Sequence, residues 1–228
     1  MTATADGVGG SIAAVCFDLD GTLVDSERVH WQAYRRVLQH YGADVELDEY
    51  RRRFIAVEGG AEWASERWAL PIDGPTLRAK KAVVYRELIG GGVAPMPGAR
   101  DCITRLHGLW RLAVVTNSSR DEAAALLAPL GVVPLLDAII TRENYGAPKP
   151  APDGYLAAAA ALGCPPAACV AVEDTPRGVR SARAAGLRAL AVPGDLMADQ
   201  DFTVATRRLP GLDALTPAFL LSLENGGH

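Results

Sequence analysis

The sequence predicts an α/β fold: a doubly wound parallel sheet that carries an inserted α-helical domain. Three observations support this fold class. Five short runs of apolar, often β-branched residues are typical of strands that are buried on both faces. Segments of helical length separate most of these runs, and one gap is far longer than a single crossover helix requires. The predicted strands are residues 12–18, 111–116, 136–141, 168–173 and 187–192.

Several helix starts can be located from the sequence. Ser119 followed three residues later by Glu122 is a capping box, in which each side chain accepts from a backbone N–H of the first turn. Thr175 and Pro176 have the residue types preferred at the N-cap and at the first helical position. Pro152 is expected at the first position of a further helix. These starts place helices after three of the predicted strands.

The long gap lies between the first and second predicted strands, and it is helical in pattern from about residue 27 to residue 88. Two apolar stripes with helical spacing run through it. They comprise His30, Ala33, Tyr34, Val37, Leu38 and Tyr41, then Leu77, Lys81, Val84, Tyr85 and Leu88. We therefore expect an α/β core of residues 1–25 and 96–228. Residues 26–95 would form a helical domain, hinged near 24–27 and 90–97.

Charge argues against a nucleic-acid partner. The chain has 23 Lys plus Arg and 27 Asp plus Glu, a net charge of −4. Nucleic-acid affinity depends on clustered positive charge. The basic triplet Arg51, Arg52 and Arg53 is expected to be a solvated helix face.

Membrane spans and export signals are also not predicted. No apolar run approaches the roughly 20 residues of a membrane helix. Residues 1–11 lack the basic and apolar regions of a signal peptide. The four cysteines form no CxxC pair, so we expect buried free thiols in a cytoplasmic protein. They are Cys16, Cys102, Cys164 and Cys169.

Carboxylates stand at the ends of two predicted strands. Asp18 and Asp20 end the first within Asp-x-Asp-Gly-Thr, and Glu173 and Asp174 end the fourth. Ligands bind at the carboxyl ends of strands in open α/β sheets. Close carboxylates repel one another unless a cation or a proton lies between them. Hard oxygen ligands suit Mg²⁺, which also takes phosphate oxygens, so the sequence predicts a magnesium site.

Phosphate-binding groups are predicted beside these carboxylates. Thr116, Asn117 and Ser118 follow the second strand and lead into a helix N-terminus, where backbone N–H groups favour an anion. Lys149 lies between two prolines, which hold it in place at little entropic cost. Its ammonium would neutralise charge on a phosphoryl group.

Together these residues resemble a known family. Asp18-x-Asp20-Gly21-Thr22, then Thr116, Lys149 and Glu173-Asp174, resemble the four motifs of the haloacid dehalogenase-like superfamily, whose core is Rossmann-like. The helical insert resembles the C1-type cap of the subgroup that contains β-phosphoglucomutases and phosphoglycolate phosphatases. The likeness covers residues 12 to about 215.

The resemblance implies a role for each motif residue. Asp18 would be the nucleophile that becomes an aspartyl-phosphate. Asp20 would protonate the leaving oxygen and then deprotonate the attacking water. Mg²⁺ would be bound by the Asp18 carboxylate, the Asp20 backbone carbonyl and Asp174, with Glu173 in its second shell or bound through water. Thr116, the Asn117 amide and Lys149 would hold the transferred phosphate.

Both a hydrolase and a mutase are compatible with these motifs. His30 and Lys81 match cap residues of β-phosphoglucomutases. Both also have a purely structural interpretation: His30 as a core or interface residue, and Lys81 as a lysine whose stem packs on apolar surface while its ammonium reaches water. Where those mutases have an arginine for a second phosphate, this chain has Gly59, flanked by Glu58 and Glu62. The two glutamates would repel a second phosphate, whereas Arg51–Arg53 upstream could compensate.

We therefore predict a Mg²⁺-dependent phosphatase for a small phosphorylated metabolite, such as phosphoglycolate or a sugar phosphate, acting as a monomer or weak dimer. A β-phosphoglucomutase-type mutase is the alternative. A non-catalytic binding module is disfavoured because every motif residue is present.

Overall fold

The short apolar runs of the sequence form a parallel sheet. The computed structural model describes residues 11–55 and 59–224, and within them six parallel strands follow the order β3-β2-β1-β4-β5-β6. Val15 of β1 lies opposite Leu112 of β2 and Val170 of β4, so β1 is central. The strands are β1 (Ala14–Phe17), β2 (Arg111–Val115), β3 (Ala138–Ile140), β4 (Cys169–Glu173), β5 (Arg188–Ala191) and β6 (Arg207–Arg208).

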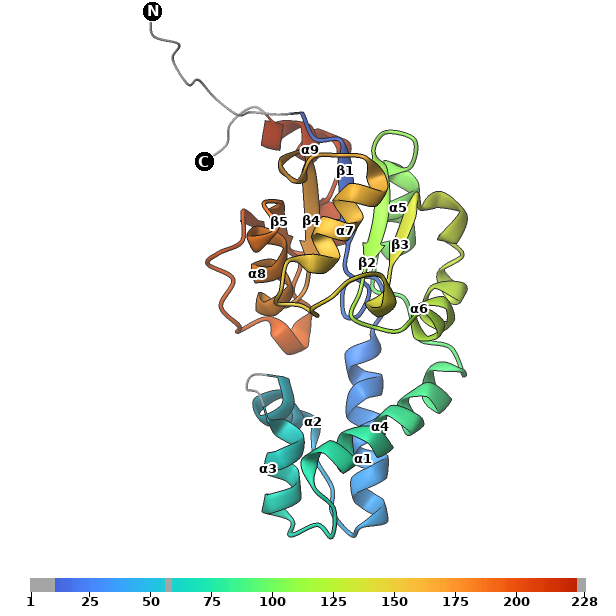
Figure 1. Ribbon diagram of the computed structural model, residues 1–228, viewed down its shortest axis with the longest axis vertical. Helices are drawn as coiled ribbons and strands as arrows, with labels where there is room; N and C mark the ends of the chain where they lie inside the picture. The colour runs from blue at the N-terminus through green and yellow to red at the C-terminus, as the bar shows by residue number, and fades with distance from the viewer. Residues whose placement is uncertain (1–10, 56–58, 225–228) are drawn as a thin grey trace, which may run out of the picture.

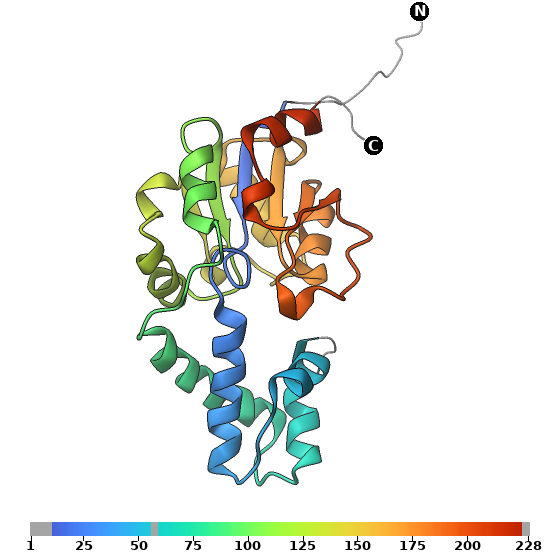
Figure 2. The same ribbon diagram turned by 180° about the vertical axis from the view of Figure 1, so that it is seen from behind.

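Helices cover both faces of this sheet (Figures 1 and 2). Side chains alternate along a strand, so Val15 and Phe17 join one apolar core while Ala14 and Cys16 join the other. The first core packs on α5 (Ala99–Leu106), α6 (Arg120–Leu127) and α9 (Pro217–Glu224), and the second on α7 (Asp153–Leu162) and α8 (Pro176–Ala184). The predicted fold class is confirmed.

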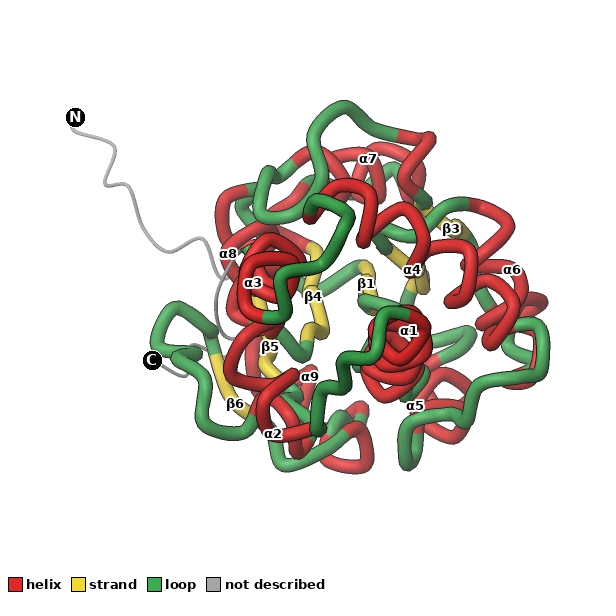
Figure 3. Tube along the Cα trace, turned by 90° about the horizontal axis from the view of Figure 1, so that it is seen from below, coloured by secondary structure: helices red, strands yellow, loops and turns green. Residues whose placement is uncertain are grey.

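The long gap between β1 and β2 forms a separate group of helices. They lie beyond the carboxyl ends of the strands in Figures 1 and 2, and Figure 3 views the molecule from that side. A third apolar cluster, which includes Leu38, Tyr50 and Leu77, holds the group together. The elements are α1 (Ser26–His40), α2 (Leu47–Tyr50), a π-helical turn (Arg51–Ile55), α3 (Gly60–Arg67) and α4 (Gly74–Ile89).

Two connections join this helical group to the sheet, and they run side by side. The backbone N–H of Asp25 donates to the carbonyl of Ala94 at 2.9 Å, and that of Met96 donates to the carbonyl of Leu23 at 2.9 Å. The segment that leads into α1 and the segment that follows α4 are therefore fastened to one another where the chain leaves and re-enters the α/β part.

The structure corrects several details of the sequence interpretation. Pro152 is the N-cap residue of α7 and not its first helical residue, whereas Thr175 and the Ser119–Glu122 capping box lie as predicted. The edge strand β6 was not predicted, because a pair of arginines has no apolar signal. Observed strands are one to three residues shorter than the predicted runs.

Two further expectations concern thiols and membrane spans. Cys16, Cys102 and Cys169 are buried and free, as predicted. Cys164 is free but only half-buried, because it lies beyond the end of α7 and not inside a strand. Within residues 11–55 and 59–224, no helix has both the length and the apolar character required to cross a bilayer.

Candidate active site

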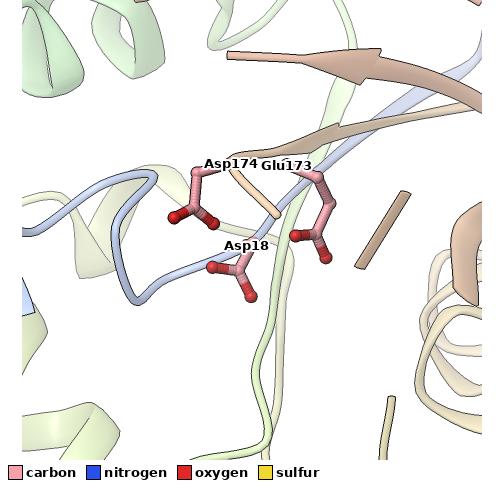
Figure 4. Close-up of side chains that lie close together, drawn as sticks. All are labelled: Asp18, Glu173 and Asp174. Carbon is pink, nitrogen blue, oxygen red and sulfur yellow. The ribbon is translucent and has the colours of Figure 1, made fainter. Parts of the chain in front are cut away.

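The strand order brings the carboxylates predicted from the sequence to one edge of the sheet. Asp18 follows β1, Glu173 ends the neighbouring strand β4, and Asp174 comes next. Figure 4 shows the three side chains converging. All three are buried, and each contributes an oxygen within 4.8 Å of the others. Three hard oxygen donors in one buried cluster fit a small divalent cation such as Mg²⁺.

Charge repulsion within this cluster is considerable. The pKa of Asp18 is raised to about 8: burial is the largest cause, Lys149 opposes it, and the charges of Glu173 and Asp20 add to it. Burial, Asp18 and Glu173 likewise raise the pKa of Asp174. A bound divalent cation would offset this repulsion and favour the ionised form of each carboxylate.

Gly21, from the Asp-x-Asp-Gly-Thr motif, makes room for the cluster. Its φ of +81° lies in the region that side-chain-bearing residues rarely adopt, and a Cβ there would be 2.1 Å from Oδ2 of Asp174. Glycine is therefore required both for the turn after β1 and for the close approach of Asp174.

Lys149 is the buried cation of the site. Its ammonium donates to Oδ1 of Asp18 at 2.5 Å, to Oε1 of Glu173 at 2.7 Å and to the carbonyl of Val115 at 2.8 Å. Burial lowers the pKa of Lys149, but the two carboxylates outweigh burial and raise the pKa overall. All three donors of the ammonium thus have acceptors, and its charge is retained.

Asp20 is not part of the carboxylate cluster and is held by hydroxyl groups. Its carboxylate accepts from the hydroxyls of Ser26 at 2.7 Å, Ser118 at 2.8 Å, Thr116 at 3.0 Å and Tyr85 at 3.3 Å. Burial raises the pKa of Asp20, but the His30 ring and the hydroxyl donors outweigh burial and lower it overall. Two of these hydroxyls, those of Ser26 and Tyr85, come from the helical group between β1 and β2.

The residues after β2 hold neighbouring groups in place. Oδ1 of Asn117 accepts from the backbone N–H of Lys149 at 3.0 Å and from the hydroxyl of Tyr145 at 2.8 Å, so this side chain positions the lysine loop. The hydroxyl of Thr116 accepts from the backbone N–H of Ser118 at 3.0 Å while donating to Asp20. Sequence reasoning had not assigned Ser118 a place beside Asp20.

His30 and Lys81 reach the same site from α1 and α4. The Lys81 ammonium contacts Nδ1 of His30, whose ring stacks on Tyr85 with centroids 4.0 Å apart. Burial lowers the pKa of His30 to about 3, with a smaller contribution from Lys81, and Asp20 opposes this shift. Burial also lowers the pKa of Lys81 to about 8. His30 is therefore the neutral acceptor of a partly desolvated lysine.

The lowered pKa of Lys81 predicts how stability depends on pH. Between about pH 8 and 10.5 the unfolded chain binds a proton that the folded chain has released, so stability rises with pH there. Relative to Lys81→Met, wild-type protein should gain about 1 kcal/mol in unfolding free energy from pH 7.5 to 9.5, since partial exposure weakens the effect. Urea unfolding measures this. Lys80→Met, which removes an exposed neighbour, should show no such trend, and a difference that shrank with pH would contradict the expectation.

The side chains of the candidate site line a single cavity of about 320 Å³. That volume is within the usual range for small-molecule sites. The predicted catalytic, phosphate-binding, metal-binding and cap residues all line it except Glu173, which is fully buried. Sequence reasoning had not assigned six further lining residues to the site: Glu27, Ala82, Tyr85, Glu122, Thr175 and Arg177. Tyr85 belongs to a predicted helical stripe, Glu122 and Thr175 were predicted only as helix caps, and Arg177 has no motif signal.

The loop expected to govern a second phosphate is placed differently from the prediction. Glu62 pairs with Arg78 at 2.5 Å and does not line the cavity, so it would not repel a bound phosphate. Arg51 pairs with Asp199 at 3.1 Å, and Arg53 lies over the Trp63 ring. Neither lines the cavity, nor does Arg52. Gly59 is exposed, and Glu58 lies outside the described residues.

Known proteins resemble this chain over most of its length. The model of the haloacid dehalogenase-like hydrolase family matches residues 12–186. Protein CbbY of Rhodobacter capsulatus is 37% identical over 217 residues, which is 89% of this chain and 95% of CbbY. Fructose-1-phosphate phosphatase YqaB of Escherichia coli (strain K12) is 35% identical over 185 residues, covering 79% of this chain and 96% of YqaB.

A solved structure extends the comparison to the fold. A mutant of CbbY from Rhodobacter sphaeroides, in complex with xylulose-(1,5)bisphosphate, superposes with a TM-score of 0.75 at 28% identity. The match covers 92% of this chain and 99% of that protein.

Proposed function

Because the chain belongs to the haloacid dehalogenase-like hydrolase family and is a phosphoric monoester hydrolase, we propose that it hydrolyses a small phosphorylated metabolite through an aspartyl-phosphate on Asp18. The observation that carries the proposal is the setting of Asp18: a buried carboxylate beside a lysine and two further carboxylates, at the base of a cavity of metabolite size. The family membership and the phosphatase relatives set aside a non-catalytic module.

Mg²⁺ is the proposed cofactor. Three groups would bind the ion: the carboxylates of Asp18 and Asp174 and the backbone carbonyl of Asp20. Glu173 would contact the ion only indirectly, for example through water, since its Oε1 already accepts from Lys149 and Tyr155. When bound, the ion would neutralise charge that develops on the phosphoryl oxygens. The buried carboxylate oxygens of the cluster fit such a hard cation.

The chain's own residues would carry two displacements. In the first, an oxygen of Asp18 forms a bond to phosphorus, the ester oxygen leaves and takes a proton from Asp20. In the second, a water oxygen forms a bond to phosphorus, the bond to Asp18 breaks and the water proton passes to Asp20. The hydroxyl donors around Asp20 favour its ionised form, which suits the second step. The proton that Asp20 takes from water in that step is the one it gives to the leaving oxygen in the next turnover. Thr116, the Asn117 amide and Lys149 would hold the phosphoryl oxygens.

Residues 26–95 would act as a cap over the site. His30, Lys81 and Tyr85 line the cavity from these helices, while Asp18 and Lys149 line it from the sheet. Movement about the paired connections near 24–27 and 90–97 would open and close the cavity, excluding water during the first step. Tyr85 and Ser26 hydrogen-bond Asp20, so such a movement would also reach the acid–base residue.

The substrate class is proposed from the relatives. Relatives named as sugar-phosphate phosphatases favour a phosphorylated sugar, with phosphoglycolate as another candidate. We further propose that the enzyme acts in the cytoplasm, in keeping with its free thiols, and as a monomer or weak dimer.

A phosphomutase is the second candidate, because His30 and Lys81 lie in the cavity where the resemblance to β-phosphoglucomutases puts them. Hydrolysis is favoured over it because Arg51, Arg52 and Arg53 do not line the cavity and so provide no cap guanidinium there for a second phosphate.

Metal removal tests the proposal. Purified protein should release inorganic phosphate from one or more of a panel of sugar phosphates and phosphoglycolate with MgCl₂, and lose this activity in EDTA. MgCl₂ should also raise the melting temperature, and Asp174→Asn should abolish that shift because it removes a carboxylate ligand.

Conversion of β-glucose 1-phosphate to the 6-phosphate with a bisphosphate primer, without net phosphate release, would favour the mutase. Equal phosphate release in EDTA would contradict the magnesium role.

A further inference from the structure

The turn after β2 offers one backbone N–H group to the active-site cavity. The N–H groups of Ser118, Ser119 and Arg120 already donate to side-chain oxygens, at 3.0, 3.0 and 3.1 Å. The N–H of Asn117, a residue that lines the cavity, donates to no group in the described part of the chain. It is therefore the N–H of this turn that a phosphate oxygen can engage.

The direction of the Asn117 N–H is set by the peptide group to which it belongs. That group is planar and trans, so its N–H points opposite to the carbonyl of Thr116. Thr116 is fully buried, and a buried carbonyl is costly without a hydrogen-bond donor. The group that donates to this carbonyl therefore also sets where the Asn117 N–H points.

Tyr145 supplies that donor. Its hydroxyl lies 2.7 Å from the carbonyl oxygen of Thr116 and donates to it. Among the described residues, no backbone N–H and no other side chain donates to this carbonyl. Tyr145 comes from the loop before Lys149 and does not line the cavity, so it reaches the peptide from the side opposite the N–H.

The Tyr145 hydroxyl has a second acceptor within reach. It lies 2.8 Å from Oδ1 of Asn117, so its single proton is shared between that oxygen and the Thr116 carbonyl. Oδ1 also accepts from the backbone N–H of Lys149 at 3.0 Å, whereas the carbonyl has no other donor in the described residues. The carbonyl therefore depends on Tyr145 more than the side-chain oxygen does.

Other contacts hold the loop of Tyr145 in place. The guanidinium of Arg142 donates to the carbonyls of Tyr145 and Gly146, both at 2.8 Å, and lies 5.3 Å from the Tyr145 ring centroid. The backbone N–H of Ala147 donates to Asp153 at 2.9 Å. Removal of the Tyr145 hydroxyl alone should therefore leave the loop and the ring in place and release only the peptide.

We propose that Tyr145 is a positioning residue: its hydroxyl holds the Thr116–Asn117 peptide in the orientation that presents the Asn117 N–H to the transferred phosphate. This inference rests on the proposed function, because it concerns how that phosphate is held. A donor contributes most when it is already aimed at the oxygen on which charge develops. A peptide that is free to turn should therefore cost reaction rate more than substrate affinity.

Steady-state kinetics test the consequence for the reaction. Tyr145→Phe keeps the ring and removes the hydroxyl. With MgCl₂ and a sugar phosphate that the wild type hydrolyses, it should lower kcat by about 10- to 100-fold and change KM by less than about threefold. Tyr41→Phe should change neither, because the Tyr41 hydroxyl makes no hydrogen bond within the described residues and does not line the cavity. A lower melting temperature of Tyr145→Phe with an unchanged kcat would show a purely structural role and overturn the proposal.

The sequence allows this peptide to be observed directly by NMR, because Thr116-Asn117 is its only Thr-Asn pair. Threonine labelled with ¹³C at the carbonyl and asparagine labelled with ¹⁵N at the backbone give one HNCO cross-peak, which reports the Thr116 carbonyl and the Asn117 N–H together. Inorganic phosphate with MgCl₂ should shift the N–H frequencies of the wild type. Tyr145→Phe should move the ¹³C frequency, since the carbonyl loses its donor, and should reduce the phosphate-induced shift. Tyr41→Phe should do neither.

The two measurements separate the role of Tyr145 from the hydrolase proposal. If the wild type hydrolyses none of the compounds tested, the hydrolase proposal fails and the cross-peak alone decides about Tyr145. A phosphate-induced shift that Tyr145→Phe reduces supports the positioning role, and an equal shift in both proteins overturns it. A fall in kcat with an unchanged cross-peak would also overturn it, while leaving the hydrolase intact. So would a wild-type Asn117 N–H that does not respond to phosphate, a result that needs no variant to fold.

Discussion

Replacing Asp18 by asparagine is expected to lower the Mg²⁺-dependent rate of phosphate release by about 10⁴-fold or more, the scale seen when a covalent nucleophile is removed. The amide is a poor nucleophile, while its carbonyl oxygen can still accept from Lys149 as Oδ1 of Asp18 does at 2.5 Å. The variant should therefore fold. Steady-state phosphate release at saturating substrate and MgCl₂ measures the effect.

Two comparisons make this result specific to Asp18. Asp121→Asn removes an exposed carboxylate from the first turn of α6 and should retain wild-type activity. Mass spectrometry of acid-quenched wild-type protein should detect a phosphoryl group on Asp18 during turnover, absent from Asp18→Asn. Substantial activity in the variant would mean that phosphate passes directly to water without the covalent intermediate.

Replacing Gly178 by alanine should lower the free energy of unfolding by about 2–3 kcal/mol, although alanine is the better helix former by about 1 kcal/mol. A Cβ on Gly178 would lie 1.9 Å from Oε2 and 2.0 Å from Cδ of Glu173. Glu173 is only 1% exposed, and its Oε1 accepts from Lys149 at 2.7 Å and Tyr155 at 2.6 Å. The Glu173 side chain therefore cannot move away from the added methyl group. Urea unfolding measures the change.

A matched glycine and a second substitution test this reasoning. Gly211 has an extended φ of 175°, and a Cβ there would meet nothing within 4 Å, so Gly211→Ala should change stability by less than about 0.5 kcal/mol. On a Glu173→Asp background, which shortens the opposing side chain, Gly178→Ala should be less harmful than in the wild type. An unchanged penalty on that background would show that the steric conflict lies elsewhere.

Strand ends were the most predictable part of the site. A parallel sheet puts the carboxyl ends of its strands at one edge, so the meeting of Asp18 with Glu173 and Asp174 follows from five apolar runs and their order. The helical group follows from the length of the gap between β1 and β2. These features depend on periodicity and chain connectivity, which a single sequence records directly.

Side-chain direction and loop paths were less predictable. Asp20 lies two residues after Asp18, yet the turn at Gly21 directs its carboxylate to four hydroxyls, two of them on α1 and α4. Glu62 was expected in a loop that faces the substrate, but it lies in α3 and pairs with Arg78 outside the cavity. Arg177 was overlooked because an exposed arginine at a helix start has no sequence pattern that separates it from a surface residue.

The three hydrogen bonds of the Lys149 ammonium bear on how such an enzyme could lose its activity over evolution. They join the end of β2 to side chains that follow or end β1 and β4, so one residue fastens the three central strands of the sheet. Without it, Asp18 and Glu173 would remain buried without their cation, a severe loss for a fold of ordinary stability. A descendant that became a binding protein could exchange Asp18 for asparagine in one step. It could not lose Lys149 alone, however, because the buried carboxylates would have to be replaced at the same time.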